Sequence, residues 1–360
     1  MSEVSGMRQT VVPGIWSWSA WQPDRNLDFN GFFVETREGN LVVDPIAPDD
    51  ALLAELRERG VAAVIVTNRD HERGSAAVAA ATGARVLAPA LDAAELTRAP
   101  DATLQPEDLV HGWRVLGFEG LKTPGEVALF DRARKAVIVG DAIWGTPAGA
   151  LTLMPDAKLA DPARALLALR RLRAVKPDHL LVGDGACIFG NAYAALNAMF
   201  AARDGVATFR VNLDELRFFQ GLDAPPAFRG AWTAEVGYLL GGMELGTAAY
   251  RLPPGVHLCP THWHAREEEL LLVLRGAPTL RMPQGTFALR EGDLVAFPVG
   301  PAGAHRLWND TQDEVEVLMI ARYAYDTDVC FYPDSDKVLI EVGDTIVRAS
   351  PALDYWDRES

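Results

Sequence analysis

The N-terminal part of the chain alternates between two kinds of apolar pattern. Short runs of aliphatic residues, such as 61–68, are typical of strands that are buried on both faces. Between them lie segments with apolar positions at helical spacing, such as 49–59 and 75–83, the second of which ends at a glycine suited to a helix C-cap. We also expect strands over 10–21, 85–89, 112–120, 126–131, 135–145 and 179–185, a hairpin over 31–45 that turns at Glu38–Asn40, a helix over 161–175 with an arginine-rich outer face, and a helix over 191–202.

The pattern changes near residues 202–207. Beyond them, short alternating segments separated by Gly and Pro turns dominate, which indicates an all-β region. We expect two strands within 236–252, two or three within 278–298 with turns at Pro283–Gly285 and Glu291–Asp293, and a further strand over 314–323. The chain therefore divides into two domains, which we place at 1–203 and 204–360.

Composition and charge narrow the function classes. The 360 residues are 49% hydrophobic, with a net charge of −15 and a pI near 4.9, which argues against nucleic acid as a partner. No apolar run is long enough to span a bilayer and the N-terminus lacks a signal-peptide pattern, so we expect a cytoplasmic protein with no membrane partner. The three cysteines, Cys187, Cys259 and Cys330, do not form a disulfide framework. Cys259 lies three residues before His262, which leaves a place near a metal open, and we interpret it as a small buried thiol.

One segment of the C-terminal half carries candidate metal chemistry. His262 and His264 are two residues apart, so on a strand both project from one face while Trp263 faces the other way. Glu269 can return to the same space after a short turn. Two imidazoles and a carboxylate form a ligand set for a transition metal, and His305 offers a fourth ligand.

The order of these residues resembles the two sequence motifs of the cupin family. The matching positions are Gly255, His262, His264, Glu269 and Gly276 for the first motif and Gly292, Pro298, Gly300, His305 and Asn309 for the second. The resemblance implies an all-β cupin barrel, a double-stranded β-helix, in which the three histidines and Glu269 hold one divalent transition metal (Fe, Mn, Ni, Cu or Zn). Glu268 is an alternative ligand, although the gap from Glu269 to Gly276 fits the motif. The resemblance also implies a small-molecule ligand or substrate and a homodimer.

Other residues of this half are candidates for the surroundings of the metal. Phe297 and Trp308 lie near the predicted ligands in sequence and are candidate pocket residues. Residues 328–342 resemble a tail that follows the second motif in some bacterial single-domain cupins. Tyr332 and Lys337 in this tail are expected to pack or to lie at the surface, and we assign them no chemistry.

Residues 10–200 resemble the metallo-β-lactamase fold, an αββα sandwich of two sheets flanked by helices. The segments that carry the resemblance are 40–45, 67–74, 121–126, 139–145 and 181–190. The metal motif of that family, His-x-His-x-Asp-His, falls on 66–71, where Val66 and Asn68 replace the leading histidines, and its later histidines fall on Glu126 and Asp184. The resemblance therefore leaves a possible second metal site made of Asp70, His71, Glu126, Asp141 and Asp184.

This second site holds mostly oxygen donors, which suit Mg²⁺, Ca²⁺ or Mn²⁺ better than Zn²⁺. A zinc hydrolase needs about three tight ligands and an activated water, for which one histidine is a poor basis. We therefore expect Asp70 to cap the following helix and His71 to form a hydrogen bond nearby. The N-terminal domain is then a scaffold, an interaction domain or a substrate-binding remnant.

Three functions are compatible with these observations. The favoured interpretation is a mononuclear metalloenzyme that acts on a small molecule, with dioxygenase chemistry preferred and Lewis-acid isomerase or lyase chemistry also open. The alternative is a non-catalytic cupin that binds or senses a small molecule, with the N-terminal domain as its scaffold. A third possibility is a metallo-hydrolase centred on the N-terminal domain.

Overall fold

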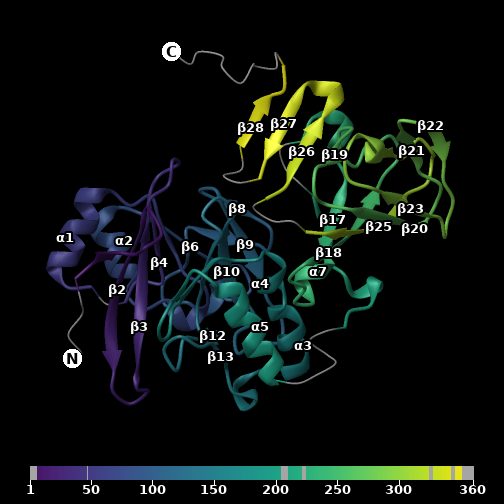
Figure 1. Cartoon of the computed structure of the whole chain (residues 1–360). Coiled ribbons are helices and arrows are strands. Elements are labelled where there is room, and N and C mark those ends of the chain that lie inside the picture. Colours follow the sequence, from purple (N-terminus) through teal and green to yellow (C-terminus); the bar gives the residue numbers. More distant parts are fainter. Residues whose placement is uncertain are drawn as a thin grey trace. The chain divides into compact units, whose positions relative to one another are not determined.

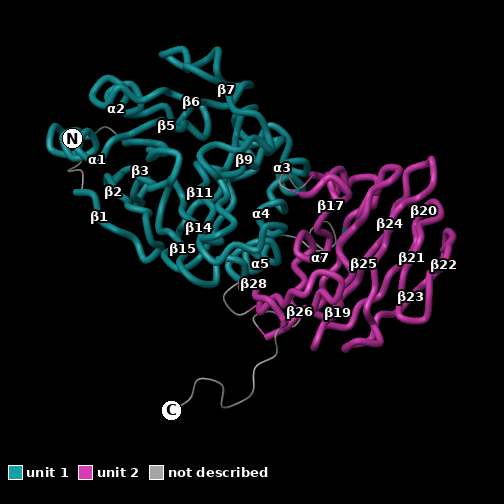
Figure 2. The backbone as a smooth tube through the Cα atoms, turned by 90° about the horizontal axis from the view of Figure 1, so that it is seen from above, with its two compact units in different colours: residues 1–210 teal, residues 211–360 magenta. Residues whose placement is uncertain are grey.

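The computed structural model describes residues 6–46, 48–203, 210–220, 224–323, 327–341 and 345–350. The chain forms two compact units, Met1–Arg210 and Val211–Ser360, and each is described by itself (Figure 1, Figure 2). The domain boundary expected between residues 203 and 204 adjoins residues 204–209, which lie outside the described residues. The two units divide after Arg210.

Two β-sheets form the centre of the N-terminal unit. The first contains, in spatial order, β1 (Arg8–Gln9), β2 (Ile15–Gln22), β3 (Leu27–Val34), β4 (Leu41–Val43), β5 (Ala63–Ile65), β6 (Arg85–Pro89) and β7 (Ala102–Leu104). It is antiparallel from β1 to β4 and parallel from β4 to β7. The second contains β15 (Ile188–Phe189), β14 (His179–Val182), β11 (Ala136–Val139), β10 (Val127–Asp131), β9 (Trp113–Gly117) and β8 (Leu109–Val110). A separate ribbon joins β12 (Ile143–Trp144) to β13 (Thr152–Leu153).

Alternation along the central strands separates the two faces of the first sheet. Phe32 and Val43 point between the sheets, where they pack with residues of the second sheet such as Leu129. Phe33 and Val42 point to the opposite face and pack with the helices there. The helices of this unit are α1 (Asp50–Arg59) and α2 (Ser75–Thr82) over the first sheet and α3 (Pro162–Leu169), α4 (Arg171–Ala174) and α5 (Ala192–Arg203) over the second. The predicted αββα sandwich is therefore confirmed.

Local sequence signals set the ends of several elements. The Asp49 side chain caps α1 by accepting the backbone N–H of Leu52 at 2.8 Å, and α2 ends at Gly83 in the left-handed conformation with a φ of 76°. The strand predicted over 10–21 is shorter, because the chain turns at residues 13–14 before β2 begins.

The predicted helix over 161–175 is two helices, and the expectation of an arginine-rich outer face is wrong for two of its residues. Arg170 and Arg173 are buried. The Arg173 guanidinium lies 4.5 Å from the ring centroid of Phe200, and burial lowers the pKa of Arg173 to about 10. Arg170 donates a hydrogen bond to the backbone carbonyl of Arg210 at 2.6 Å. An arginine can be buried in this way because its planar head stacks on an aromatic ring and still donates hydrogen bonds.

The C-terminal unit is rich in β-strands, as predicted. Its largest sheet contains, in spatial order, β16 (Phe219–Gln220), β17 (Trp232–Glu235), β18 (Leu245–Leu252), β25 (Val315–Arg322), β20 (Glu269–Arg275) and β23 (Leu294–Phe297). The smaller sheets contain β19 (Trp263–His264), β26 (Val329–Tyr332), β27 (Lys337–Ile340) and β28 (Thr345–Arg348), and β22 (Gly285–Ala288), β21 (Thr279–Met282) and β24 (Arg306–Trp308). Apolar residues from these strands, such as Leu271, Leu280 and Val317, form its core.

The region 236–252 differs from the expected pair of strands. Val236–Leu239 form a short helix, α7, and one strand, β18, follows. A short apolar run is compatible with either a buried helix or a buried strand, so periodicity does not separate the two. Close packing of the helical turn on β18 depends on Gly237, where an added Cβ would lie 2.7 Å from the backbone nitrogen of Thr247.

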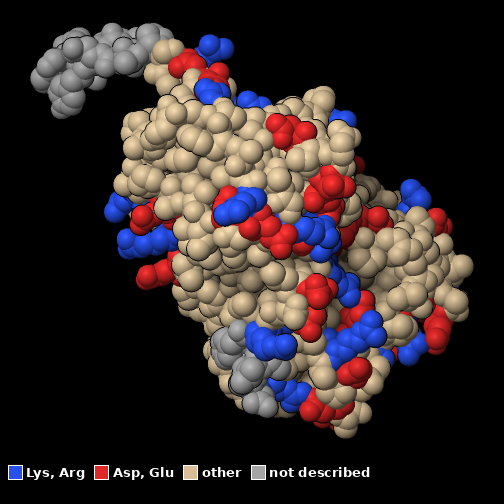
Figure 3. All heavy atoms as spheres, turned by 90° about the vertical axis from the view of Figure 1, so that its right-hand side faces the viewer, with Lys and Arg blue, Asp and Glu red and all other residues tan. Residues whose placement is uncertain are grey.

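Two observations concern membranes and the protein surface. In the part of the chain that the structure describes, none of the helices combines the length and apolar character needed to cross a membrane. On the face drawn in Figure 3, basic and acidic side chains are interspersed and are not separated by sign.

Candidate functional site

The four predicted metal ligands come from neighbouring segments of the C-terminal unit. His264 ends β19, and Glu269 is the first residue of β20. The His262 N–H donates to the His305 carbonyl at 3.1 Å, and the His305 N–H donates to the His262 carbonyl at 2.9 Å. This backbone pairing joins the two sequence motifs.

The Nε2 atoms of the three histidines face one carboxylate oxygen. The distances from Glu269 Oε2 are 4.0 Å to His262, 3.6 Å to His264 and 3.5 Å to His305. Among the described residues, this buried oxygen has no hydrogen-bond partner. Two atoms that each lie about 2.0–2.2 Å from one ion are at most about 4.4 Å apart. The unpaired oxygen and the nitrogens that face it therefore fit a metal ion.

The Nδ1 atom of each imidazole is held by an oxygen that can only accept. The pairs are His264 with Asp328 Oδ2 at 2.7 Å, His262 with the Pro260 carbonyl at 3.0 Å and His305 with the Gly303 carbonyl at 3.0 Å. Each Nδ1 must therefore carry a proton, and in the neutral imidazole this leaves the lone pair of Nε2 directed toward Glu269. This arrangement is typical of imidazoles that are oriented for metal binding.

Asp328 is a residue that sequence reasoning missed. Its buried side chain also accepts the backbone N–H of Arg266 at 2.8 Å, so it ties the turn after β19 to the imidazole of His264. Asp328 lies 64 positions beyond His264. No spacing rule connects residues so far apart, and the one available signal was its position at the start of the tail over 328–342.

Burial controls the protonation of these groups. Burial and the neighbouring imidazoles lower the pKa of His262 to about 4 and that of His305 to about 3. Burial also acts to lower the pKa of His264, but the charges of Glu269 and Asp328 outweigh it, and the pKa is raised. Burial raises the pKa of Glu269. At neutral pH, His262 and His305 are thus neutral imidazoles, the form that binds metals.

A cavity of about 150 Å³ lies beside the candidate ligands. Its lining is Tyr250, Leu258, Cys259, His262, Glu269, Leu271, Phe297, His305, Leu307 and Met319. Phe297, a predicted pocket residue, stacks on His305 with the ring centroids 3.7 Å apart. Burial raises the pKa of Cys259 to about 12, so this residue presents a thiol to the cavity.

Two other candidates lie away from this cavity. Trp308, the second predicted pocket residue, is not part of the lining, because side chains alternate along β24 and Leu307 points inward. The ring of Trp308 packs instead on His257, with the centroids 5.7 Å apart. Glu268 is exposed, whereas its neighbour Glu269 lines the cavity.

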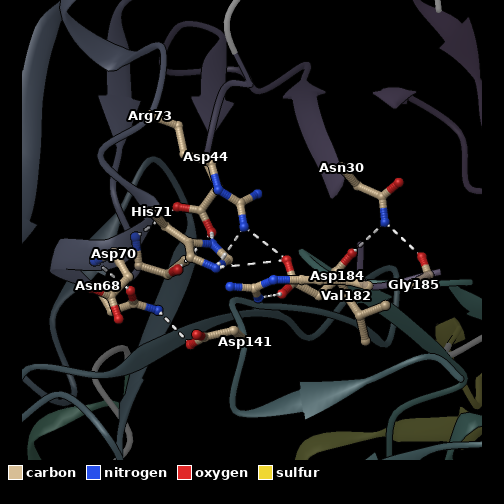
Figure 4. A network of polar contacts seen from close by, with 12 residues as sticks. Asn30, Asp44, Asn68, Asp70, His71, Arg73, Asp141, Val182, Asp184 and Gly185 are labelled. Carbon is tan, nitrogen blue, oxygen red and sulfur yellow. Dashed lines mark hydrogen bonds and ion pairs between the residues drawn. The ribbon is translucent and has the colours of Figure 1, made fainter. Parts of the chain in front are cut away.

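The possible second site in the N-terminal unit contains a chain of polar contacts (Figure 4). His71 Nδ1 lies 2.8 Å from Asp44 Oδ2, and His71 Nε2 lies 3.0 Å from Arg73 Nη2. The same Arg73 nitrogen donates to Asp184 Oδ1 at 2.8 Å. A guanidinium can only donate, so His71 Nε2 accepts and Nδ1–H donates to Asp44. The expected hydrogen bond of His71 is therefore present.

The expectation that Asp70 caps the following helix is wrong. Gly74 is the N-cap of α2, and no side chain bonds to the helix there. Asn68 instead caps a short turn, and its side chain accepts the backbone N–H of Asp70 at 2.9 Å. This turn leaves the Asp70 carboxylate partly exposed, where it pairs with Lys122.

Glu126 and Asp141 are buried acids of the same region. Asn68 Nδ2 donates to Asp141 Oδ1 at 3.1 Å, whereas Glu126 Oε1 has no hydrogen-bond partner among the described residues. Burial and the charge of Asp141 raise the pKa of Glu126 well above its ordinary value. Burial also raises the pKa of Asp141.

These five side chains do not form a ligand set. In the described part of the N-terminal unit, no three His, Cys, Asp or Glu side chains bring ligand atoms within 4.8 Å of one another. Such groups do occur in the described part of the C-terminal unit, and they are Cys259–His262–His305, His262–His264–Cys330 and His264–Glu267–Asp328. None of them contains Glu269, whose place among the candidate ligands rests on the 3.5–4.0 Å distances from its Oε2 to the three histidines. The metal that a metallo-β-lactamase fold implies thus does not fit the residues present in the N-terminal unit.

Comparisons with known families cover both units. The family model described as the metallo-beta-lactamase superfamily matches residues 7–203, more than half of the chain. The chain belongs to the metallo-beta-lactamase superfamily. A second family model, described as the cupin domain, matches residues 249–321, which include all four candidate ligands. No curated protein matches this superfamily member at a significant level.

Solved structures resemble separate parts of this superfamily member. A sugar phosphate isomerase of the cupin superfamily from Silicibacter pomeroyi is 25% identical, covers 41% of this chain and 98% of its own, and has a TM-score of 0.36. A metallo-beta-lactamase from Pontibacter korlensis is 18% identical, with coverages of 56% and 99% and a TM-score of 0.46. A metallo-beta-lactamase from Pseudomonas aeruginosa, solved in a mono-zinc form, is 18% identical, with coverages of 55% and 96% and a TM-score of 0.43.

Proposed function

We propose that the C-terminal unit holds one divalent transition metal and acts as a dioxygenase on a small molecule. The ligands proposed are His262, His264, Glu269 and His305. The observation that carries the proposal is Glu269 Oε2, a buried oxygen that has no hydrogen-bond partner in the described part of the chain and faces three imidazole nitrogens at 3.5–4.0 Å. An unsatisfied buried polar group costs about 1–3 kcal/mol, and more if it is charged. A bound cation removes that cost.

The cavity supports a small and mostly apolar substrate. Its volume of about 150 Å³ is close to that of an engineered protein cavity that binds benzene. No Lys or Arg is among its lining residues. A phosphate group is usually bound by cationic side chains or by several N–H donors. The name of the Silicibacter pomeroyi protein refers to sugar phosphates. We therefore exclude such compounds from the proposed substrates of this chain.

The residues around the ligands orient them and the substrate. A bound redox-active metal would supply chemistry toward dioxygen, an apolar molecule suited to an apolar cavity. Asp328 holds the imidazole of His264, and Phe297 holds that of His305 by stacking. Burial raises the pKa of Tyr250 well above its ordinary value, so its hydroxyl stays protonated and can donate a hydrogen bond to a polar atom of the substrate.

Metal analysis and nitric oxide binding test this proposal without knowledge of the substrate. Protein purified without added metal should contain about one equivalent of transition metal, and the double variant His262→Ala/His264→Ala should contain none. His257→Ala is a matched control, because His257 packs on Trp308 and Phe228 and is not part of the cavity lining. Iron(II)-loaded protein should bind nitric oxide, a probe of positions open to dioxygen, and should consume dioxygen with small aromatic or aliphatic compounds.

Two results would contradict parts of the proposal in different ways. Metal retained by the His262→Ala/His264→Ala variant at the wild-type level would show that the ligand set is wrong. Iron(II)-loaded protein that does not bind nitric oxide would instead indicate a closed coordination shell, and would favour the non-catalytic binding or sensing function.

A further inference from the structure

The N-terminal unit raises a separate question, because its fold implies a metal that its residues do not fit. We propose that Arg73 supplies the cation of this site, so that a covalently attached guanidinium takes the place of the metal ion. The N-terminal unit is then a metal-independent scaffold. This inference does not depend on the function proposed for the C-terminal unit.

The position of the guanidinium is the first support. His71 Nε2 and Asp184 Oδ1 are 3.9 Å apart, a separation that one ion could bridge, since two ligand atoms at about 2.0–2.2 Å from an ion are at most about 4.4 Å apart. The Nη2 atom of Arg73 lies 3.0 Å from the first and 2.8 Å from the second (Figure 4). It therefore bridges the two atoms and uses the lone pair that His71 would need for a metal.

The charge around Arg73 is the second support. Asp184 is buried, and a carboxylate in such a place needs a compensating cation, which Arg73 provides at 2.8 Å. The Arg73 side chain is only 12% exposed, and its guanidinium also lies 4.2 Å from the ring centroid of Phe29. This guanidinium is thus held by Phe29 on one side and by Asp184 on the other, and it is positioned to neutralise Asp184.

The opposite side of His71 is built as it would be for a metal ligand. Asp44 accepts the Nδ1–H of His71 and is itself held by Thr67, whose backbone N–H and hydroxyl donate to it at 2.8 and 2.6 Å. Gly183 leaves just enough room for the imidazole, because an added Cβ would lie 2.6 Å from His71 Cε1. These contacts fix the direction of the His71 Nε2 lone pair, and Arg73 Nη2 occupies the position that a metal ion bound to Nε2 would take.

The consequence is chemical as well as structural. A guanidinium offers no open coordination position and does not lower the pKa of a water as a metal ion does. Metallo-hydrolysis of the kind considered for this unit therefore has no catalyst here. Because the cation is part of the chain, chelators should not affect the stability of the N-terminal unit.

Substitution of Arg73 in the full-length protein tests the proposal. Arg73→Ala should lower the Tm of the N-terminal transition by roughly 10 °C, because it leaves the buried carboxylate of Asp184 without its nearest cation. Arg25→Ala is the matched control: Arg25 lies 3.8 Å from Asp184, but its side chain is 51% exposed. It should lower the Tm by no more than about 2 °C. Methylguanidinium should restore part of the Tm lost in Arg73→Ala and should leave the Arg25→Ala variant unchanged.

Metal titration gives an independent readout once the C-terminal ligands are removed. In the His262→Ala/His264→Ala background, the full-length protein should bind neither Zn²⁺ nor Mn²⁺ in the N-terminal unit. The further change Arg73→Ala should create a weak site that disappears with His71→Ala. If Arg73→Ala does not fold, Arg73→Ala/Asp184→Asn should fold, because it also removes the uncompensated charge.

Three outcomes would overturn the proposal. One is an Arg73→Ala variant as stable as Arg25→Ala. Another is metal bound in the His262→Ala/His264→Ala background and lost on His71→Ala while Arg73 is intact. The last is an unfolded Arg73→Ala variant that neither methylguanidinium nor Asp184→Asn rescues, which would mean that Arg73 acts by packing and not by its charge.

Discussion

Replacement of Asp328 should weaken metal binding although Asp328 is not a proposed ligand. Its Oδ2 atom lies 2.7 Å from His264 Nδ1, and its Oδ1 atom accepts the N–H of Arg266 at 2.8 Å. His262 and His305 are oriented by neutral carbonyls, so His264 is the one proposed histidine ligand whose Nδ1 has an anionic partner. Asp328→Ala therefore removes both the orientation of this imidazole and the negative charge behind it.

The size of the effect follows from the hydrogen bond that is lost. A hydrogen bond to a charged group contributes about 1.5–3 kcal/mol, which corresponds to roughly a 10- to 150-fold change in an equilibrium constant. Substitution of such outer partners of metal-bound histidines typically costs about 10- to 100-fold in affinity. We expect a loss within that range for Asp328→Ala. A smaller loss is expected for Asp328→Asn, because the amide oxygen can still accept from Nδ1–H but carries no charge.

Competition with a chromophoric chelator measures these affinities directly. Glu268→Gln is the matched control, since it removes an exposed carboxylate beside Glu269. It should change the affinity by less than about twofold, as expected for a screened surface charge. Equal affinities for Asp328→Ala and Glu268→Gln would refute the reasoning, because they would show that the contact between Asp328 and His264 does not influence the metal.

Three further predictions concern stability and assembly. The raised pKa of Glu126 means that the folded protein keeps a proton that the unfolded chain loses near pH 4.5. The free energy of unfolding should therefore fall by about 1.4 kcal/mol per pH unit between pH 4.5 and the folded pKa. Glu126→Gln should remove this pH dependence, which thermal unfolding at about pH 5 and pH 7 measures. Asp70→Ala and His71→Ala should leave metal content and dioxygen uptake unchanged. His71→Ala should destabilise the protein by about 2–4 kcal/mol and Asp70→Ala by less than about 1 kcal/mol in the same assay. A homodimer, proposed from the cupin resemblance, should give twice the chain mass of 39.1 kDa in light scattering, and a value near 39.1 kDa would contradict it.

Most of the fold follows from short-range patterns in the sequence. Buried strands such as β5 and β11 are continuous aliphatic runs, and helix α1 begins at the capping residue Asp49. The differences arise where tertiary packing decides between local options. The pattern of Val236–Leu239 is compatible with a helix or a strand. The sequence around Arg173 predicts a surface residue, but its contact with the ring of Phe200 places it in the interior.

The candidate metal centre was also predictable where local spacing places its residues. The spacing of His262, His264 and Glu269 and the second motif around His305 identified four side chains that do lie together, because a strand fixes which residues share a face. Asp328 could not be found in this way, since it reaches His264 through the pairing of β19 with β26 and not through local spacing.

The N-terminal site shows why the loss of a motif is only half of the information. Val66 and Asn68 reveal from sequence alone that two expected histidines are absent, but they do not reveal what neutralises the acids that remain. For Asp184 the answer is Arg73, which lies 111 positions earlier in the sequence and whose guanidinium bridges Asp184 and His71. A buried carboxyl group must either pair with a cation, as Asp184 does with Arg73, or keep a proton, as the raised pKa of Glu126 indicates. A cationic side chain next to the remaining acids therefore shows more directly than the missing histidines that a metal ion is not needed at such a site.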